Sequence, residues 1–301
     1  MLKRATILLI LILVVLVAGA SYAILKGEKI DTIWKNGTSE NLKEPFSVLV
    51  MGQVGKGQGG QWHFAPDLAD TIVLIQFNPE TEMINLISLP RDLYGDFGDY
   101  RFKINRVISD SRIDEVMLTL PAISGIETKN YVILDLSVVK EIVDGLGGIQ
   151  IELAEPIYDP VGSFYLKAGT NHLNGEDVVW LIRNRYAPQG DFFREKNQHL
   201  VLEAIFNKFN ELTSLKKTSF IFRMLPQISK STSNFSLGQT ISNFRDVKNI
   251  GFNSIVLDFD TKLWQSMRIP NPSGEDAYVL VPKDGINQYK PVKEYIQEHL
   301  R

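Results

Sequence analysis

The 301 residues of this chain include no cysteine, and this absence removes several kinds of site at once. A chain without cysteine has no disulfide, no thiolate nucleophile, no cysteine-ligated metal and no lipidated cysteine. Only four histidines are present, and their positions do not follow the spacing of zinc ligands. Any bound metal should therefore be a hard cation, such as magnesium, held by oxygen atoms.

An excess of positive charge is also missing. The chain carries 32 lysines and arginines against 35 aspartates and glutamates, a net charge of −3. Proteins that bind nucleic acid through its phosphates need a basic face, so no nucleic-acid partner is expected. An anion site in this chain must instead be built from a local group of arginines.

The sequence has one long apolar run, and it lies at the N-terminus. Residues 5–25 are almost uninterruptedly apolar, and about 20 helical residues cross a bilayer core. Lys3 and Arg4 precede the run, which predicts that residues 1–4 are a cytoplasmic tail and that the rest of the chain is extracytoplasmic. The sequence therefore predicts a single-pass protein of the cell membrane.

A cleaved signal peptide is the alternative, because Ala18-Gly19-Ala20 resembles a cleavage site. The apolar run is longer than the usual core of a signal peptide, which favours an uncleaved anchor. Residues 26–44 then form a short tether, and residues 45–301 form one extracytoplasmic domain.

The domain alternates strand-like and helix-like segments. Two β-rich runs around Asn78-Pro79 predict a hairpin over residues 71–88, and Asn174 is expected to cap a helix. Further strands are predicted at 46–52, 130–136, 149–153 and 253–259, and further helices at 113–120, 137–148, from Asp191 onward and at the C-terminus. This alternation predicts an α/β fold in which a mixed central sheet has helices on both faces, in three layers, preceded by one transmembrane helix.

The segment "SLPRDLYG" places two charges directly after a predicted strand. Asp70 stands just before the first strand of the hairpin, and Arg91 and Asp92 follow the second. Antiparallel pairing brings these two ends together, so the three side chains are expected at one end of the sheet.

Three arginines are close together later in the chain. Arg183, Arg185 and Arg194 lie within twelve residues, and converging guanidinium groups suit phosphate or pyrophosphate. Asp191 and Glu195 are interspersed among them, so an exposed basic turn is the alternative interpretation.

Several ordered motifs together resemble one family. They are "ADTIVLIQFNPETEMINLISLPRDLYG", "KIN", "NYVILDLSVVKEIVDGLGGIQIEL", "LNGEDVVWLIRNRY" and "GDFFREKNQ". On these segments the chain resembles the LytR-CpsA-Psr family of membrane-anchored phosphotransferases of the cell envelope. The single N-terminal anchor is similar to that of the family as well.

The resemblance implies an activity and a site. Proteins of this family move a glycopolymer from a polyprenyl-pyrophosphate lipid to a peptidoglycan acceptor, with the lipid in an apolar pocket and Mg2+ and arginines at the pyrophosphate. By position, Asp70 is the implied metal ligand, and Arg91 and Asp92 are the implied catalytic residues. The implied pyrophosphate-binding residues are Lys103, Asn105, Arg183, Arg185 and Arg194.

The chain also departs from the family pattern. Leu68 and Ala69 replace an Arg-Ser pair, Gln53-Val54-Gly55 replaces an aspartate that would be a second metal ligand, and Phe193 and Asn197 replace a glycine and an arginine. We therefore expect a site with fewer cations, in which Asp67 substitutes as the second ligand. A polyprenyl-pyrophosphate pyrophosphatase and a non-catalytic lipid-pyrophosphate-binding protein remain as alternatives.

Overall fold

The computed structural model describes residues 45–54, 67–160, 163–213, 216, 219–220, 223–224, 232–234, 250–270 and 276–301. The predicted tail, the predicted anchor over 5–25 and nearly all of the predicted tether lie outside these residues. Within the described ranges, no helix is both long and apolar enough to cross a membrane.

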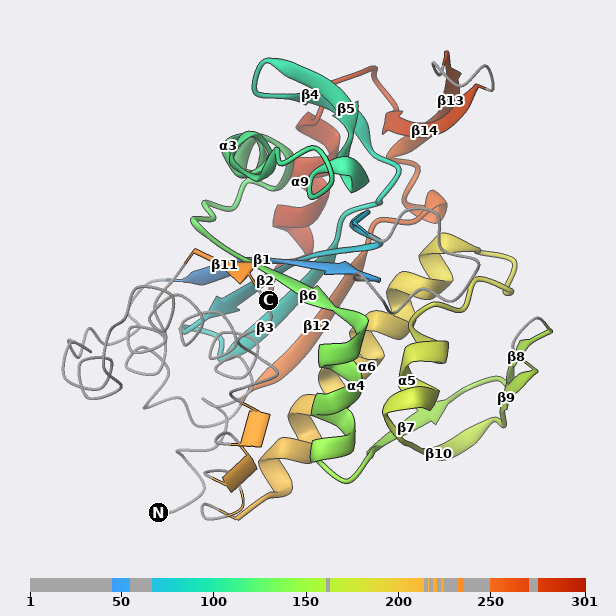
Figure 1. Ribbon diagram of the computed structural model, residues 1–301. Helices are drawn as coiled ribbons and strands as arrows, with labels where there is room; N and C mark the ends of the chain where they lie inside the picture. The colour runs from blue at the N-terminus through green and yellow to red at the C-terminus, as the bar shows by residue number, and fades with distance from the viewer. Residues whose placement is uncertain are drawn as a thin grey trace.

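A mixed sheet forms the centre of the domain (Figure 1). Its strand order is β11-β6-β1-β2-β3-β12. The strands are β1 (Phe46–Gln53), β2 (Thr71–Asn78), β3 (Met83–Ser88), β6 (Asn130–Asp135), β11 (Thr232–Ser233) and β12 (Gly251–Val256). β1 and β3 both pair antiparallel with β2, whereas β6 and β12 run parallel to their neighbours β1 and β3.

Helices cover both faces of this sheet, as the sequence predicts. Successive residues of β1 point to opposite faces, so Val48 and Val50 enter one core while Leu49 and Met51 enter the other. The first core is covered by α4 (Leu136–Gly145), α5 (Gly175–Leu181) and α6 (Asp191–Glu211), and the second by α3 (Ile113–Ser124) and α9 (Lys290–His299). The predicted three-layer arrangement is confirmed.

Four two-stranded ribbons are present within the described ranges, outside the central sheet. They pair β4 (Tyr94–Phe97) with β5 (Tyr100–Lys103), β7 (Ile149–Leu153) with β10 (Gly169–Leu173), β8 (Ile157–Asp159) with β9 (Phe164–Leu166), and β13 (Trp264–Ile269) with β14 (Ala277–Pro282). Two 3-10 helices, η2 (Ile104–Arg106) and η3 (Phe259–Thr261), connect parts of the chain. The predicted strand at 149–153 is therefore present, but it pairs outside the central sheet.

The predicted hairpin is confirmed, and it fixes the position of the candidate site. Val73 is paired with Ser88, and the amide of Leu89 donates a hydrogen bond of 2.9 Å to the carbonyl of Ile72. The start of β2 and the end of β3 therefore lie at the same end of the sheet, with Asp70 directly before β2 and Arg91 shortly after β3.

The segment between α5 and α6 carries two of the candidate arginines. Asn174 caps α5 as predicted, and its side chain accepts hydrogen bonds from two amides of the first turn while Asp177 bonds back to its amide. α5 ends at Leu181, so Arg183 and Arg185 lie in the connection rather than on the helix. Gly190 directly precedes α6 with φ 55°, a backbone conformation that glycine adopts without strain.

The first turns of α6 bury polar side chains, unlike its apolar second half. Five polar side chains are each at most 5% exposed: Arg194, Glu195, Asn197, Gln198 and His199. His199 holds this end of the helix against the sheet, because its ring nitrogens bond the hydroxyls of two serines, one on β3 at 2.8 Å and one on β12 at 2.6 Å. Burial lowers the pKa of His199 to about 3, so the ring is neutral at physiological pH.

Candidate active site

Asp191 lies at the centre of a group of charged side chains. Its Oδ1 is 3.3 Å from Nε of Arg185 and 3.5 Å from Nε of Arg91. Its Oδ2 accepts a hydrogen bond of 2.8 Å from Nη2 of Arg194. Asp70 pairs with Arg91 through Oδ1, which also lies 3.8 Å from Nη2 of Arg185. We call these five residues the charged cluster; it has three positive and two negative charges.

Three separate parts of the chain supply the charged cluster. Asp70 and Arg91 come from the ends of β2 and β3, Arg185 from the connection after α5, and Asp191 and Arg194 from the first turn of α6. Positions three apart share a helix face, which lets Asp191 pair with Arg194. The structure thus brings together four of the predicted site residues.

Neighbouring charges decide the protonation of this cluster. Burial by itself would raise the pKa of Asp70, but the positive charges of Arg91, Arg194 and Arg185 outweigh burial and hold that pKa below its usual value. Burial lowers the pKa of Arg194 to about 10, although Asp191 opposes the change. Both groups remain charged at neutral pH, so the cluster keeps its excess of positive charge.

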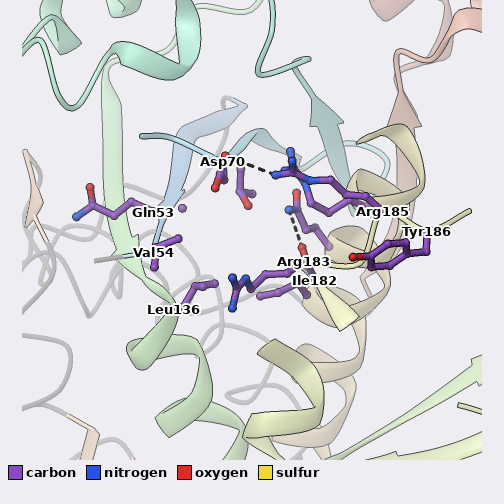
Figure 2. A pocket seen from close by; sticks show the side chains of 12 residues that line it. Gln53, Val54, Asp70, Leu136, Ile182, Arg183, Arg185 and Tyr186 are labelled. Carbon is purple, nitrogen blue, oxygen red and sulfur yellow. Dashed lines mark hydrogen bonds and ion pairs between the residues drawn. The ribbon is translucent and has the colours of Figure 1, made fainter. Parts of the chain in front are cut away.

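A cavity of about 240 Å3 opens beside the charged cluster (Figure 2). We call it the cationic pocket. Figure 2 shows Asp70, Arg183 and Arg185 around its opening. The lining combines cationic side chains with apolar ones: Arg183, Arg185 and Arg194 with Val54, Leu136 and Ile182.

The cationic pocket contains buried polar atoms without hydrogen-bond partners. Arg194 is 2% exposed, and neither its Nε nor its Nη1 donates a hydrogen bond within the described part of the chain. Oε1 of Gln198, which lines the same cavity, also makes none. A buried unsatisfied polar group costs about 1–3 kcal/mol, so a ligand whose anionic oxygens accept hydrogen bonds from Arg194 would stabilise this pocket.

The remaining predicted residues lie beside the cluster rather than in the cationic pocket. Nζ of Lys103 is 2.6 Å from Oδ1 of Asp92 and donates a hydrogen bond of 3.3 Å to the carbonyl of Tyr278. Asn105 is buried, and its backbone amide donates a hydrogen bond of 3.2 Å to the backbone carbonyl of Arg91. Asn105 therefore supports the backbone that carries Arg91, and its contacts do not place it on a ligand.

A magnesium ion would find one suitable carboxylate here. Asp70 uses Oδ1 for both arginine contacts, and among the described residues no ion pair uses its Oδ2. Nε2 of Gln53 donates a hydrogen bond of 2.7 Å to Asp135, and Figure 2 shows the Gln53 side chain directed away from Asp70. Asp67 is not among the residues that line the pocket.

The protein side chains alone therefore do not complete a magnesium site, and a bound ligand would have to supply further oxygen atoms. Across the described ranges, no three histidine, aspartate or glutamate side chains are arranged to hold a metal. Magnesium is commonly bound by one or two carboxylates together with substrate phosphates and water. Asp70 could supply the carboxylate of a site of that kind.

Comparison with known proteins assigns the chain to a family. The model of the LytR_cpsA_psr family matches residues 16–269, which is most of the chain. The chain belongs to the LytR_cpsA_psr family. The resemblance found in the motifs is thereby confirmed.

Individual members of the LytR_cpsA_psr family match over long stretches. The polyisoprenyl-teichoic acid–peptidoglycan teichoic acid transferase TagV of Bacillus subtilis (strain 168) is 27% identical over 331 residues, which cover 99% of this chain and 79% of TagV. The transferase TagU of Enterococcus faecalis (strain ATCC 700802 / V583) is 28% identical over 215 residues, covering 69% of this chain and 68% of TagU. The crystal structure of B. subtilis TagV has a TM-score of 0.60 at 23% identity, covers 86% of this chain and 98% of that chain, and shows a shared fold.

The sequence did not single out three residues of this LytR_cpsA_psr site. Asp191 forms ion pairs with three arginines. Gln198 lines the cationic pocket and has a buried side-chain oxygen without a partner, and Glu195 is buried with no hydrogen bond to either carboxylate oxygen. Burial raises the pKa of Glu195 to about 8, and the nearby charge of Asp191 adds to the effect while Arg194 opposes it. The available signal was their spacing: positions 191, 194, 195 and 198 share one helix face.

Proposed function

We propose that this protein is a phosphotransferase that moves a glycopolymer from a polyprenyl-pyrophosphate carrier to peptidoglycan. The observation that carries the proposal is Arg194, a buried cation that lines a pocket with an apolar wall and has two donors without hydrogen-bond partners. Family membership supports it, and so do the names of the relatives TagV and TagU, which are teichoic acid transferases.

The two halves of the cationic pocket suit the two halves of the lipid donor. Arg183, Arg185 and Arg194 would bind the pyrophosphate, because guanidinium forks match the geometry of phosphate oxygens. The apolar wall of Val54, Leu136 and Ile182 would contact the first part of the polyprenyl chain.

The transfer step uses residues on both sides of the charged cluster. Asp92 accepts the proton of the acceptor hydroxyl, and the oxygen of that hydroxyl bonds to the phosphorus that carries the glycopolymer. The bond from this phosphorus to the bridging oxygen breaks, the bridging oxygen keeps the electron pair, and polyprenyl phosphate leaves. Arg91 stabilises the charge that develops on the phosphoryl oxygens, and Lys103 holds Asp92 in place through the contact of 2.6 Å.

Magnesium and the membrane anchor belong to the same proposal. Asp70 would hold the ion, which supplies additional neutralisation of pyrophosphate charge when it is bound. Residues 5–25 would anchor the protein in the cell membrane, with the N-terminus cytoplasmic and the domain that carries the site extracytoplasmic.

The test is a transfer assay with the full chain in detergent. Labelled polyprenyl-pyrophosphate glycopolymer and peptidoglycan are mixed with the protein, and label in the wall polymer and released polyprenyl phosphate are both measured. Arg91→Ala and Arg183→Ala should each lower transfer by about 100-fold or more, because each removes a cation aimed at the transferred group. Arg106→Ala is the matched control, since Arg106 is exposed and pairs only with Asp110 among the contacts described.

Different results would assign different functions. Release of polyprenyl phosphate without labelled wall would identify a pyrophosphatase, and bound lipid without either product would identify a non-catalytic binder. Native mass spectrometry of the same preparation, with and without magnesium, reports the bound lipid directly. Magnesium titrations of Asp67→Ala and Asp70→Asn test the metal assignment, and an unchanged affinity in Asp67→Ala would reject Asp67 as a second ligand.

A further inference from the structure

A second hollow of about 110 Å3 lies on the other side of the charged cluster. Its polar side is formed by Asp92, Asp191 and Gln189, and its apolar side by Phe259, Tyr278 and Leu280. We call it the aromatic hollow. None of the residues that line it also lines the cationic pocket.

The walls of the aromatic hollow are exposed aromatic rings. Phe259 is 48% exposed and Tyr278 is 40% exposed, although large apolar side chains are usually buried. The Phe259 ring meets the buried Phe192 edge-on, with ring centroids 5.1 Å apart and an angle of 84°. Phe259 is therefore held in a fixed orientation with much of its surface open to a ligand, which lowers the entropy cost of binding.

The two elements that carry these rings are tied to the site. Asp258, next to Phe259, forms an ion pair of 3.0 Å with Lys196 on α6. On β14, the amide of Leu280 donates a hydrogen bond of 2.9 Å to the carbonyl of Asp92. The positions of the rings relative to Asp92 are thus fixed by direct contacts.

The polar side of the hollow offers hydrogen-bond acceptors. Tyr278, Asp92 and Asp191 line the same hollow. Burial raises the pKa of Tyr278, and the negative charges of Asp92 and Asp191 raise it further. A phenol hydroxyl and two carboxylates accept hydrogen bonds from ligand hydroxyls, while aromatic rings contact apolar C–H groups.

This combination favours a neutral, hydroxylated ring over a charged ligand. An anion would meet Asp92 and Asp191, and a cation would find their charges already compensated by Lys103 and by three arginines. A saccharide matches both sides, because the C–H face of a pyranose packs on an aromatic ring and its hydroxyls donate to carboxylates.

The position of the hollow fits an acceptor rather than a donor. Arg91 pairs on one side with Asp70, which lines the cationic pocket, and on the other with Asp191, which lines the aromatic hollow. In phosphoryl transfer the attacking and leaving oxygens are roughly in line, so donor and acceptor must approach the phosphorus from different sides. Asp92, the proposed base, lines the hollow and not the pocket.

We propose that the aromatic hollow binds one saccharide unit of the acceptor and presents its hydroxyl to Asp92. The inference rests on the proposed transferase function for its role in turnover. Saccharide binding itself does not depend on that function. Phe259 and Tyr278 would set the affinity for the acceptor and leave the affinity for the lipid donor unchanged.

The test measures saccharide binding and transfer separately on the full chain in detergent. The probe is a β-1,4-linked N-acetylglucosamine tetramer, followed by saturation-transfer NMR. Phe259→Leu keeps an apolar side chain against Phe192 and removes the ring, and it should raise the Kd of the tetramer at least tenfold. In the transfer assay the same variant should raise KM for peptidoglycan and leave KM for the lipid donor unchanged.

Tyr165→Ala is the control, because Tyr165 is 62% exposed on β9 and does not line either cavity. Tetramer binding that is equal in wild type and Phe259→Leu, or absent from wild type, would overturn the inference. Transfer with an unchanged acceptor KM in Phe259→Leu would overturn it while leaving the proposed function intact. Phe259-dependent binding in a protein that transfers nothing would instead overturn the function and retain the saccharide site.

Discussion

Two groups of polar side chains include residues on or next to β2 and β3, and they differ in how they meet their hydrogen-bond requirements. The first is the charged cluster at the start of β2 and the end of β3. The second, the amide cluster, consists of Gln76, Asn85 and Asn253, on the adjacent strands β2, β3 and β12, with the backbone of Arg301. The first group consists of charged side chains, three of which line the cationic pocket, whereas the second consists of neutral side-chain amides that bond to one another and to the backbone of Arg301.

Asn85 is completely buried and fully bonded. Its Nδ2 donates to Oε1 of Gln76 at 2.9 Å and to the carbonyl of Arg301 at 3.2 Å. Its Oδ1 accepts from Nδ2 of Asn253 at 2.7 Å and from the amide of Arg301 at 3.0 Å. Arg194 is equally buried but has two nitrogens without partners. Asn85 therefore has its hydrogen bonds satisfied within the protein, whereas Arg194 does not.

Arg194→Met should produce the largest change. Transfer should fall by about 100- to 1,000-fold, because a cation at the pyrophosphate is lost. The free energy of unfolding should stay the same or rise by about 1 kcal/mol, since Asp191 keeps two other arginines and an unsatisfied buried charge is removed. Urea unfolding and the transfer assay measure the two effects, and a large loss of stability would make Arg194 a structural residue.

Asn85→Ala should show the opposite combination. Four hydrogen bonds are lost and their buried partners are left unsatisfied, so the free energy of unfolding should fall by about 3 kcal/mol. Transfer per folded molecule should not change. Asn207→Ala is the control, because Asn207 is exposed on α6. Reduced transfer in folded Asn85→Ala would join the two clusters into one functional unit.

Glu195→Gln should sharpen the comparison through pH. The pKa of Glu195 is raised from 4.5 to about 8 by folding, so the native state binds the proton more tightly than the unfolded state does. This group's contribution to stability is fully present below pH 4.5 and is lost as the pH rises to about 8, a difference on the order of 3–5 kcal/mol. The amide should remove this pH dependence and stabilise the protein above pH 8.

The exposed Glu203 lies on the same helix, and Glu203→Gln is the control for the Glu195 experiment. Urea unfolding at several pH values between 4 and 9 measures the effect. A parallel pH profile in wild type and Glu195→Gln would show that the Glu195 carboxylate is solvated and does not lie buried as described.

Local sequence signals predicted much of the fold because each acts within a few residues. Asn78-Pro79 marked the turn of the hairpin, and Asn174 marked the start of α5 by a side chain that bonds the next amides. The partner of β7 was not predictable in this way, because the alternation of apolar residues indicates a strand and not its neighbour.

A contact between site residues was predictable from the sequence only where the end of a strand determined their positions. The hairpin placed Asp70 beside Arg91, and this contact is present. Asp191 was passed over because an acidic residue in the first turn of a helix is ordinary, and its three ion pairs form only in the folded chain. Glu195 was missed for a related reason: burial of a charged side chain depends on tertiary packing and leaves no local pattern.

The strand order also affects when the site can form during synthesis and folding of the chain. β12 pairs with β3 although more than 160 residues separate them, and Asp191 lies 100 positions after Arg91. At about 5–20 residues per second, synthesis needs about 5–20 seconds to deliver Asp191 after Arg91 has been made. During that interval the hairpin lacks its edge strand β12, and Arg91 lacks the carboxylate of Asp191. Completion of the site is therefore a late event in folding, set by the slow closure of long-range contacts.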